Sequence, residues 1–126
     1  MKYFTHKEFD SPDLPGSGKE MQSSTLAMLD TAREIAGIPF RISSGYRTSS
    51  YNQAVGGVEN SAHTRGYAAD IRIDGFTEAQ ITRMIAALTI AGFMRIGKAK
   101  TFIHVDNDPD KPSPAYWDYG KRSHIA

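Results

Sequence analysis

Residues 68–73, AADIRI, alternate in character and predict a β-strand. Side chains alternate between the two faces of a strand, so the aliphatic residues share one face and Asp70 lies on the other. A carboxylate in the middle of a strand needs a compensating partner, because burying an unpaired charge is costly. The preceding segment 61–67, SAHTRGY, places His63 seven positions before Asp70. This stretch therefore predicts a strand of the fold and a polar site on one face of that strand.

A second pair of strands is predicted in the C-terminal half. The segments 93–96 (FMRI) and 101–106 (TFIHVD) flank the turn-like sequence GKAK, a pattern typical of a β-hairpin or of two neighbouring strands. Alternation in the second segment puts His104 and Asp106 on one face and the aliphatic residues on the other. The polar face of this strand matches the one that carries Asp70.

Two amphipathic helices are expected to cover the sheet. In residues 21–36 apolar side chains recur at steps of three and four, and Gly37 with a proline two residues later is a typical helix end. Thr77 and Gln80 form a capping-box signature before a second apolar repeat, which ends at Gly92. Each helix has one apolar face to bury.

Shorter elements complete the predicted fold. Residues 39–44 are expected to form a short strand, residues 48–55 a short helix and residues 58–66 a loop. The proline-rich tail 108–120 is expected to be irregular rather than a strand, because proline disrupts strand pairing. The sum is a small α+β domain with an antiparallel sheet and helices packed on one face.

Length and composition indicate one globular domain spanning residues 1–126, with 40% hydrophobic residues, 23% charged residues and a formal net charge of +1. This charge balance gives no reason to expect nucleic-acid binding. No stretch approaches the roughly 18 apolar residues of a membrane helix, and the N-terminus lacks the apolar run of a signal peptide. We therefore expect a monomer, synthesised in the cytoplasm without a signal peptide and not inserted into membranes. The sequence has no cysteine, so any metal ligands must be His, Asp or Glu.

His63, Asp70 and His104 form the candidate ligand set. Two imidazoles and one carboxylate leave a fourth position for water, as catalytic zinc sites do. Mn²⁺, Fe²⁺ or Co²⁺ can use the same groups. On spacing alone, a solvent-facing or hydrogen-bonded His–Asp pair is the alternative interpretation.

Three segments occur in the order found in a known family: SGYRTSSYNQAVGG (44–57), SAHTRGYAAD (61–70) and FIHVD (102–106). They resemble peptidase M15, a family of zinc D,D-carboxypeptidases and endopeptidases that includes phage endolysins. The family pattern S-x-H-x-x-G-x-A-x-D is matched at every fixed position from Ser61 to Asp70. The resemblance extends from about Phe4 to Tyr119. It implies a small α+β fold with the zinc site on an antiparallel sheet, the architecture of the hedgehog signalling domain.

The resemblance also implies roles for individual residues. His63, Asp70 and His104 would hold one Zn²⁺ and leave a position for the attacking water. Arg47 precedes the first ligand as the family's arginine does, and it would bind a substrate carboxylate or steady an oxyanion. Ser61 would hydrogen-bond a ligand or the loop.

The general base is where the sequence departs from the family. Many members carry Glu or Asp three positions before the last ligand, and here that position is Thr101. Asp106 is therefore the candidate catalytic acid–base group. Its alternatives are a hydrogen-bond acceptor that orients a histidine, or a solvated carboxylate at the strand end.

Aromatic residues could extend the substrate site. Tyr46 and Trp117 are candidates for lining a groove that holds a peptide or glycan, and Ser61 is grouped with them as a candidate substrate contact. Packing in the core or over it is the alternative for both rings.

The resemblance implies a hydrolase that cuts an amide bond in peptidoglycan stem peptides, as a D,D-carboxypeptidase or an endopeptidase. A short chain without a signal fits a phage or prophage endolysin that acts on the cell wall. Two alternatives stay open. One is a non-catalytic, zinc-containing module that binds cell wall or serves as a phage structural protein, and the other is a metal-dependent hydrolase of another small substrate.

Overall fold

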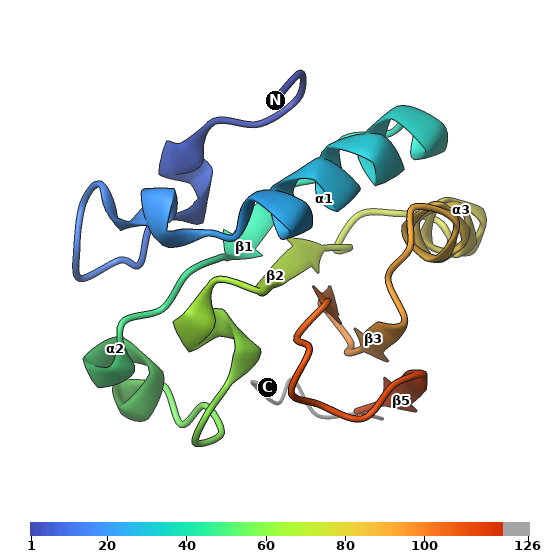
Figure 1. The fold of residues 1–126 in the computed structure, drawn as a ribbon. Helices are drawn as coiled ribbons and strands as arrows, with labels where there is room; N and C mark the ends of the chain where they lie inside the picture. Colours follow the sequence, from blue (N-terminus) through green and yellow to red (C-terminus); the bar gives the residue numbers. More distant parts are fainter. Residues whose placement is uncertain (120–126) are drawn as a thin grey trace.

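Five strands form the centre of the fold in a computed structural model that describes residues 1–119. The strands are β1 (Ile42–Ser44), β2 (Ala68–Arg72), β3 (Arg95–Lys98), β4 (Phe102–Asp106) and β5 (Ala115–Asp118). They make one sheet in the order β1-β2-β4-β3-β5 (Figure 1). The predicted α+β class is confirmed, and the strands expected at 68–73 and around GKAK are present.

The tail prediction was wrong, because residues 115–118 form strand β5 and pair in parallel with β3. The sheet is therefore mixed: the predicted antiparallel pairing holds for three of its pairs, and the parallel pair of β3 and β5 was not predicted. The prolines that argued against a strand all precede Ala115 and do not interrupt the ladder. Pairing with β5 gives partners to the backbone groups along the outer side of β3, which would otherwise be an unpaired edge.

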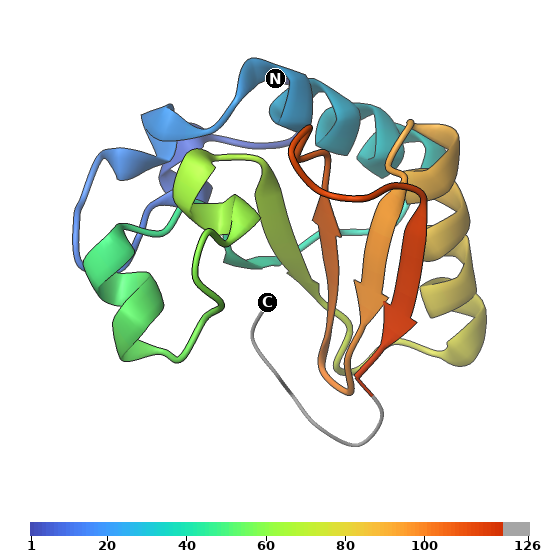
Figure 2. The same cartoon turned by 60° about the horizontal axis from the view of Figure 1, so that its bottom comes forward.

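Two long helices cover one face of the sheet, α1 (Ser23–Ala36) and α3 (Glu78–Ile90). The predicted capping box at the start of α3 is present, since Thr77 and Gln80 exchange side-chain to backbone hydrogen bonds. Both helices contribute to a core with the aliphatic face of β2 and β4. Figure 2 shows α1 above this layer and α3 at its side. The helices thus leave the other face of the sheet, which carries Asp70, for a site.

Short helical segments surround that polar face: η1 (His6–Phe9), η2 (Ser17–Glu20), α2 (Ser49–Ala54) and η3 (Ala62–Arg65). The predicted helix at 48–55 is confirmed as α2. A loop was predicted where η3 forms a single 3₁₀ turn. Within residues 1–119 no helix is both long enough and apolar enough to cross a membrane.

The strand register assembles one row of residues across all five strands: Ser44, Asp70, His104, Gly97 and Trp117. Residues paired across neighbouring strands share a face of the sheet. The row therefore joins positions 44 to 117 in space, although they are far apart in the chain.

Candidate metal centre and substrate cleft

His63 lies in η3, immediately before β2. The side chain of Ser61 accepts a hydrogen bond from the backbone N–H of His63 at 3.2 Å and begins the turn. The turn ends at Gly66 with a φ of 80°, where a Cβ would lie 2.3 Å from the carbonyl oxygen of Glu20. The motif needs glycine at this point, because the backbone conformation and the close approach both exclude a side chain. The turn delivers the His63 ring onto the sheet.

The ring of His63 is held in one tautomer. Its Nδ1 lies 2.7 Å from the carbonyl oxygen of Gly45, so Nδ1 donates a proton and Nε2 presents its lone pair. Burial lowers the pKa of His63, which favours the neutral ring. Among the described residues, Nε2 is buried without a hydrogen-bond partner.

Asp70 faces this nitrogen from β2. Its Oδ1 lies 3.3 Å from Nε2 of His63, so a lone pair faces a carboxylate oxygen. Such a pair repels unless a cation, either a metal ion or a proton on Nε2, lies between the two atoms. Burial alone raises the pKa of Asp70, but contacts with His63 and His104 outweigh burial and hold that pKa well below the usual carboxyl range. Asp70 is therefore ionised and available as a ligand.

His104 completes the cluster from β4. Its Nδ1 lies 2.9 Å from Oδ1 of Asp70, and its Nε2 lies 2.7 Å from Oδ2 of Asp106. Burial alone lowers the pKa of His104, but its hydrogen bonds with Asp106 and Asp70 outweigh burial and raise it. Because Nε2 of His104 donates its hydrogen bond to Oδ2 of Asp106, the other ring nitrogen, Nδ1, is directed at the centre of the cluster.

The donor atoms of His63, Asp70 and His104 all lie within 4.8 Å of one another, and all three residues are buried. The three predicted ligands are thus brought together, and the group could hold a metal ion. The unpartnered Nε2 of His63, directed at a carboxylate, fits this interpretation. Two imidazole nitrogens and one carboxylate oxygen are the donors that Zn²⁺ takes in catalytic sites.

Arg47 holds the carboxylate of Asp70 in place. Its side chain is buried, and Nη2 lies 3.3 Å from Oδ2 of Asp70. Its Nε donates to the hydroxyl of Ser44 and its Nη1 to the side-chain carbonyl of Asn52, each at 3.0 Å. Sequence reasoning missed Ser44 and Asn52, because neither carries a pattern that distinguishes it from a surface polar residue.

A cleft of about 270 Å³ opens beside Arg47 and Asp70. Phe102 and Tyr51 give it apolar walls, and Glu8 adds an exposed carboxylate. Tyr46, a predicted substrate contact, instead packs against the core and lines a separate hollow with Leu14 and Lys19. The cleft reaches Asp70, one member of the ligand cluster.

Both carboxylate oxygens of Asp106 accept hydrogen bonds. Oδ2 contacts His104, while Oδ1 accepts from Nε of Arg95 at 2.8 Å and from the backbone N–H of Asp108 at 3.2 Å. Burial alone raises the pKa of Asp106, but the bond to His104 and the charge of Arg95 outweigh burial and lower it. These contacts match those of a group that orients His104.

Trp117 lies against the other side of His104, with ring centroids 5.6 Å apart. Gly97 separates the two residues in the sheet, and a Cβ on Gly97 would lie 2.3 Å from the indole nitrogen. The absence of a side chain lets the indole cross β3 and reach His104. Tyr119 extends the aromatic surface from Trp117 to Phe102, with centroid distances of 6.3 and 6.0 Å.

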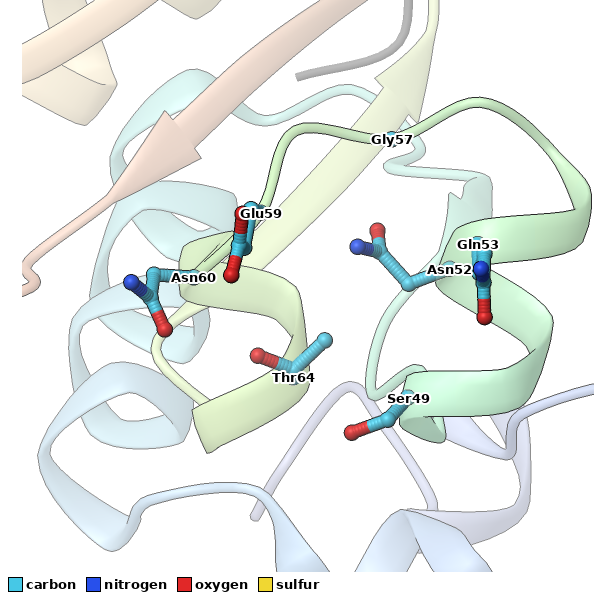
Figure 3. A pocket seen from close by; sticks show the side chains of 7 residues that line it. All are labelled: Ser49, Asn52, Gln53, Gly57, Glu59, Asn60 and Thr64. Carbon is cyan, nitrogen blue, oxygen red and sulfur yellow. The ribbon is translucent and has the colours of Figure 1, made fainter.

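A second hollow of about 590 Å³ lies on the other flank of α2 (Figure 3). Its lining consists of one glycine and residues with polar side chains: Gly57, Ser49, Asn52, Gln53, Glu59, Asn60 and Thr64. Figure 3 shows the Asn52 amide directed from α2 toward Glu59 and Thr64. Asn52 therefore contributes to this hollow and also holds Arg47.

The order of the motifs and this geometry agree with a comparison against protein families. A family model described as Peptidase M15 matches residues 3–106. The chain belongs to the peptidase M15 family. Membership makes a peptide the substrate class and makes the protein a peptidase, and the matched range includes all three members of the ligand cluster. Among curated proteins, none matches the chain.

Proposed function

We propose that this M15 peptidase is zinc-dependent and hydrolyses an amide bond of peptidoglycan stem peptides, as a D,D-carboxypeptidase or an endopeptidase. The observation that carries the proposal is the buried convergence of His63, Asp70 and His104, with donor atoms within 4.8 Å of one another. A buried set of two imidazoles and one carboxylate favours Zn²⁺ over the hard ions Mg²⁺ and Ca²⁺, which prefer oxygen ligands.

A bound Zn²⁺ supplies a Lewis acid for the scissile carbonyl and lowers the pKa of a water molecule. The chain supplies the arrangement around it. The Gly45 carbonyl keeps the lone pair of His63 on Nε2, and Arg47 fixes the Asp70 carboxylate. These supports fix the direction of each donor atom before substrate arrives, so little reorganisation is needed during catalysis.

Substrate contacts are proposed along the cleft. Arg47 lies in its wall beside Asp70, where a guanidinium can attract the carboxylate or the polarised carbonyl of a peptide. Trp117 lies outside this cleft, on the side of His104 away from Asp70, and is proposed as a flat apolar contact for a part of the substrate that extends past His104. Ser61 acts through the turn that carries His63, since its side chain accepts from the His63 backbone N–H.

Proton transfer needs a group other than Thr101, which is exposed in the turn before β4 and is no base near neutral pH. Asp106 is proposed as a positioning residue for His104, because each of its oxygens already accepts a hydrogen bond. Glu8 lines the cleft and is exposed. Within residues 1–119, the close backbone partner of Glu8 is the N–H of Thr5, which donates to Oε2 at 2.7 Å. Glu8 is the proposed proton acceptor.

Action on the cell wall, in the manner of an endolysin, is part of the same proposal. The alternative is a module in which zinc is structural and hydrolysis has been lost, which the threonine at position 101 favours. Both alternatives include the metal site, so metal binding alone does not separate them.

The test combines metal analysis with product analysis. Purified protein is assayed for bound zinc and for cleavage of muropeptides by mass spectrometry, beside His63→Ala and the exposed His6→Ala as a control. We expect one zinc per chain, cleavage that a chelator abolishes and zinc restores, and loss of both properties in His63→Ala alone. Zinc binding without cleavage of any stem-peptide bond would favour the structural module, and cleavage that survives complete removal of metal would refute zinc dependence.

A further inference from the structure

Arg95 lies on β3 and has no role in the function described above. Its side chain is mostly buried, with 14% of its surface exposed. The guanidinium contacts three separate segments. Nε donates to Oδ1 of Asp106 at 2.8 Å, Nη1 donates to the carbonyl oxygen of Pro112 at 2.6 Å, and the group lies 5.1 Å from the ring centre of Trp117. These contacts hold the guanidinium in one position.

The first contact bears on His104. Because Arg95 holds Oδ1 of Asp106, the second oxygen of that carboxylate is left to contact Nε2 of His104 at 2.7 Å. A carboxylate on one imidazole nitrogen keeps the proton there and leaves the other nitrogen as the ligand. The guanidinium therefore acts on the metal centre through one intervening side chain.

The other contacts bear on Trp117. The guanidinium lies over the indole, an arrangement in which the positive charge is attracted to the face of the ring. The same indole lies 5.6 Å from the His104 ring across Gly97. The bond to Pro112 ties down the chain that leads into β5. Arg95 thus holds the aromatic surface against the imidazole that it helps to orient.

We propose that Arg95 is a positioning residue that couples the two sides of the site. One guanidinium sets the nitrogen through which His104 meets the metal, and it holds Trp117 against the same imidazole. The inference rests on the proposed metal site. This role requires arginine. Its planar guanidinium can donate to the Asp106 carboxylate and the Pro112 carbonyl while its face covers the Trp117 ring, whereas lysine offers a single point charge.

The chain offers a clean measurement, since Trp117 is its only tryptophan. Wild type, Arg95→Met, Arg95→Lys and Trp117→Phe are compared with Arg72→Met, which removes an arginine from the exposed pair with Asp74. Zinc affinity is measured by competition with a chromogenic chelator. Trp117 emission and its quenching by acrylamide are measured in metal-free protein, and circular dichroism checks that each variant is folded.

We expect Arg95→Met to weaken zinc binding by about 10- to 100-fold, the range found when a support of a metal ligand is lost. Its Trp117 emission should shift to longer wavelength and be quenched more readily. Arg95→Lys should show both effects in weaker form, and it provides the test if Arg95→Met does not fold. Arg72→Met should bind zinc as wild type does. Trp117→Phe leaves the bond from Arg95 to Asp106 in place and should therefore lose less zinc affinity than Arg95→Met.

Wild-type zinc affinity and unchanged Trp117 quenching in the Arg95 variants would overturn the inference. If wild type itself binds no zinc, the proposed function fails instead. Quenching in the metal-free variants still decides whether Arg95 holds Trp117, and unchanged quenching there would overturn the coupling as well.

Discussion

The guanidinium of Arg47 lies 3.3 Å from the carboxylate of Asp70, and both side chains are buried. A buried charge that loses its partner is strongly destabilising, because the remaining charge is neither solvated nor compensated. Asp70 is also a proposed metal ligand, so this pair links the stability of the fold to the metal centre.

We expect Arg47→Met to lower the free energy of unfolding of the metal-free protein by about 3–5 kcal/mol, measured by urea denaturation. The second change Asp70→Asn should recover part of the loss, since it removes the uncompensated charge. Arg72→Met breaks an exposed pair and should cost at most about 1 kcal/mol. A loss in Arg47→Met no larger than in Arg72→Met would contradict the expectation.

The contact between Gly97 and Trp117 predicts the effect of adding one methyl group. In Gly97→Ala the new Cβ meets the indole, which must move away from His104. We expect a loss of about 1–3 kcal/mol, typical of overpacking, together with red-shifted and more accessible Trp117 fluorescence. In a Trp117→Ala background, Gly97→Ala should cost much less stability than it does in wild type, because the indole that the new Cβ meets is gone. If Gly97→Ala costs as much in that background as in wild type, the contact is not the cause.

Substitutions of Glu8 and Asp106 are expected to affect different quantities, kcat for Glu8 and zinc affinity for Asp106. Glu8→Gln keeps an oxygen for the Thr5 N–H but removes the base, so kcat should fall by about 10²- to 10⁴-fold at unchanged zinc affinity. Asp106→Asn should weaken zinc binding by about 10- to 100-fold, because His104 loses its orienting charge. Glu59→Gln serves as the control. Glu59 lines the separate hollow beside α2, so this change should alter neither kcat nor zinc affinity. The assignment is wrong if Asp106→Asn loses only kcat and Glu8→Gln is fully active.

Metal binding should stabilise the folded chain. A ligand that binds only the native state adds about 2.7 kcal/mol when its free concentration is 100 times Kd. Thermal melting with and without zinc should therefore show a clear rise in Tm for wild type and for His6→Ala. In His63→Ala the rise should be lost, because one ligand atom is missing. Equal shifts in all three proteins would indicate zinc binding elsewhere.

The carboxylate of Asp10 is expected to make the stability of the fold depend on pH in the acid range. The backbone N–H groups of Gly16 and Gly18 bond its carboxylate and lower the pKa of Asp10. Because its native pKa is lowered, the folded state binds fewer protons than the unfolded state at acidic pH. Asp10 therefore adds stability at pH values above its ordinary pKa of 3.8, and this added stability is lost as the pH falls through the lower native pKa. Asp10→Asn should be less stable than wild type at neutral pH, and the gap should close in acid. Denaturation curves that stay equally separated at low pH would exclude this origin.

Much of the fold could be predicted from local pattern. The alternation at 68–73, the apolar spacing at 21–36 and the capping box at Thr77 each depend on residues close in sequence, and all three elements are present. The prediction for the tail was wrong because it, too, used only residues close in sequence. Its prolines were counted against a strand, but pairing of β5 depends on the distant edge of β3.

The candidate ligand set is the part of the site that could be predicted from the sequence by itself. A chain without cysteine is limited to His, Asp and Glu as donors, and the resemblance to peptidase M15 pointed to His63, Asp70 and His104. The tertiary structure alone decided which nitrogen of each histidine faces the cluster, because the Gly45 carbonyl and Asp106 settle it through hydrogen bonds. It also decided the parts played by Arg95 and Gly97. Strand register places both beside His104, and register is a relation between segments that no single segment encodes.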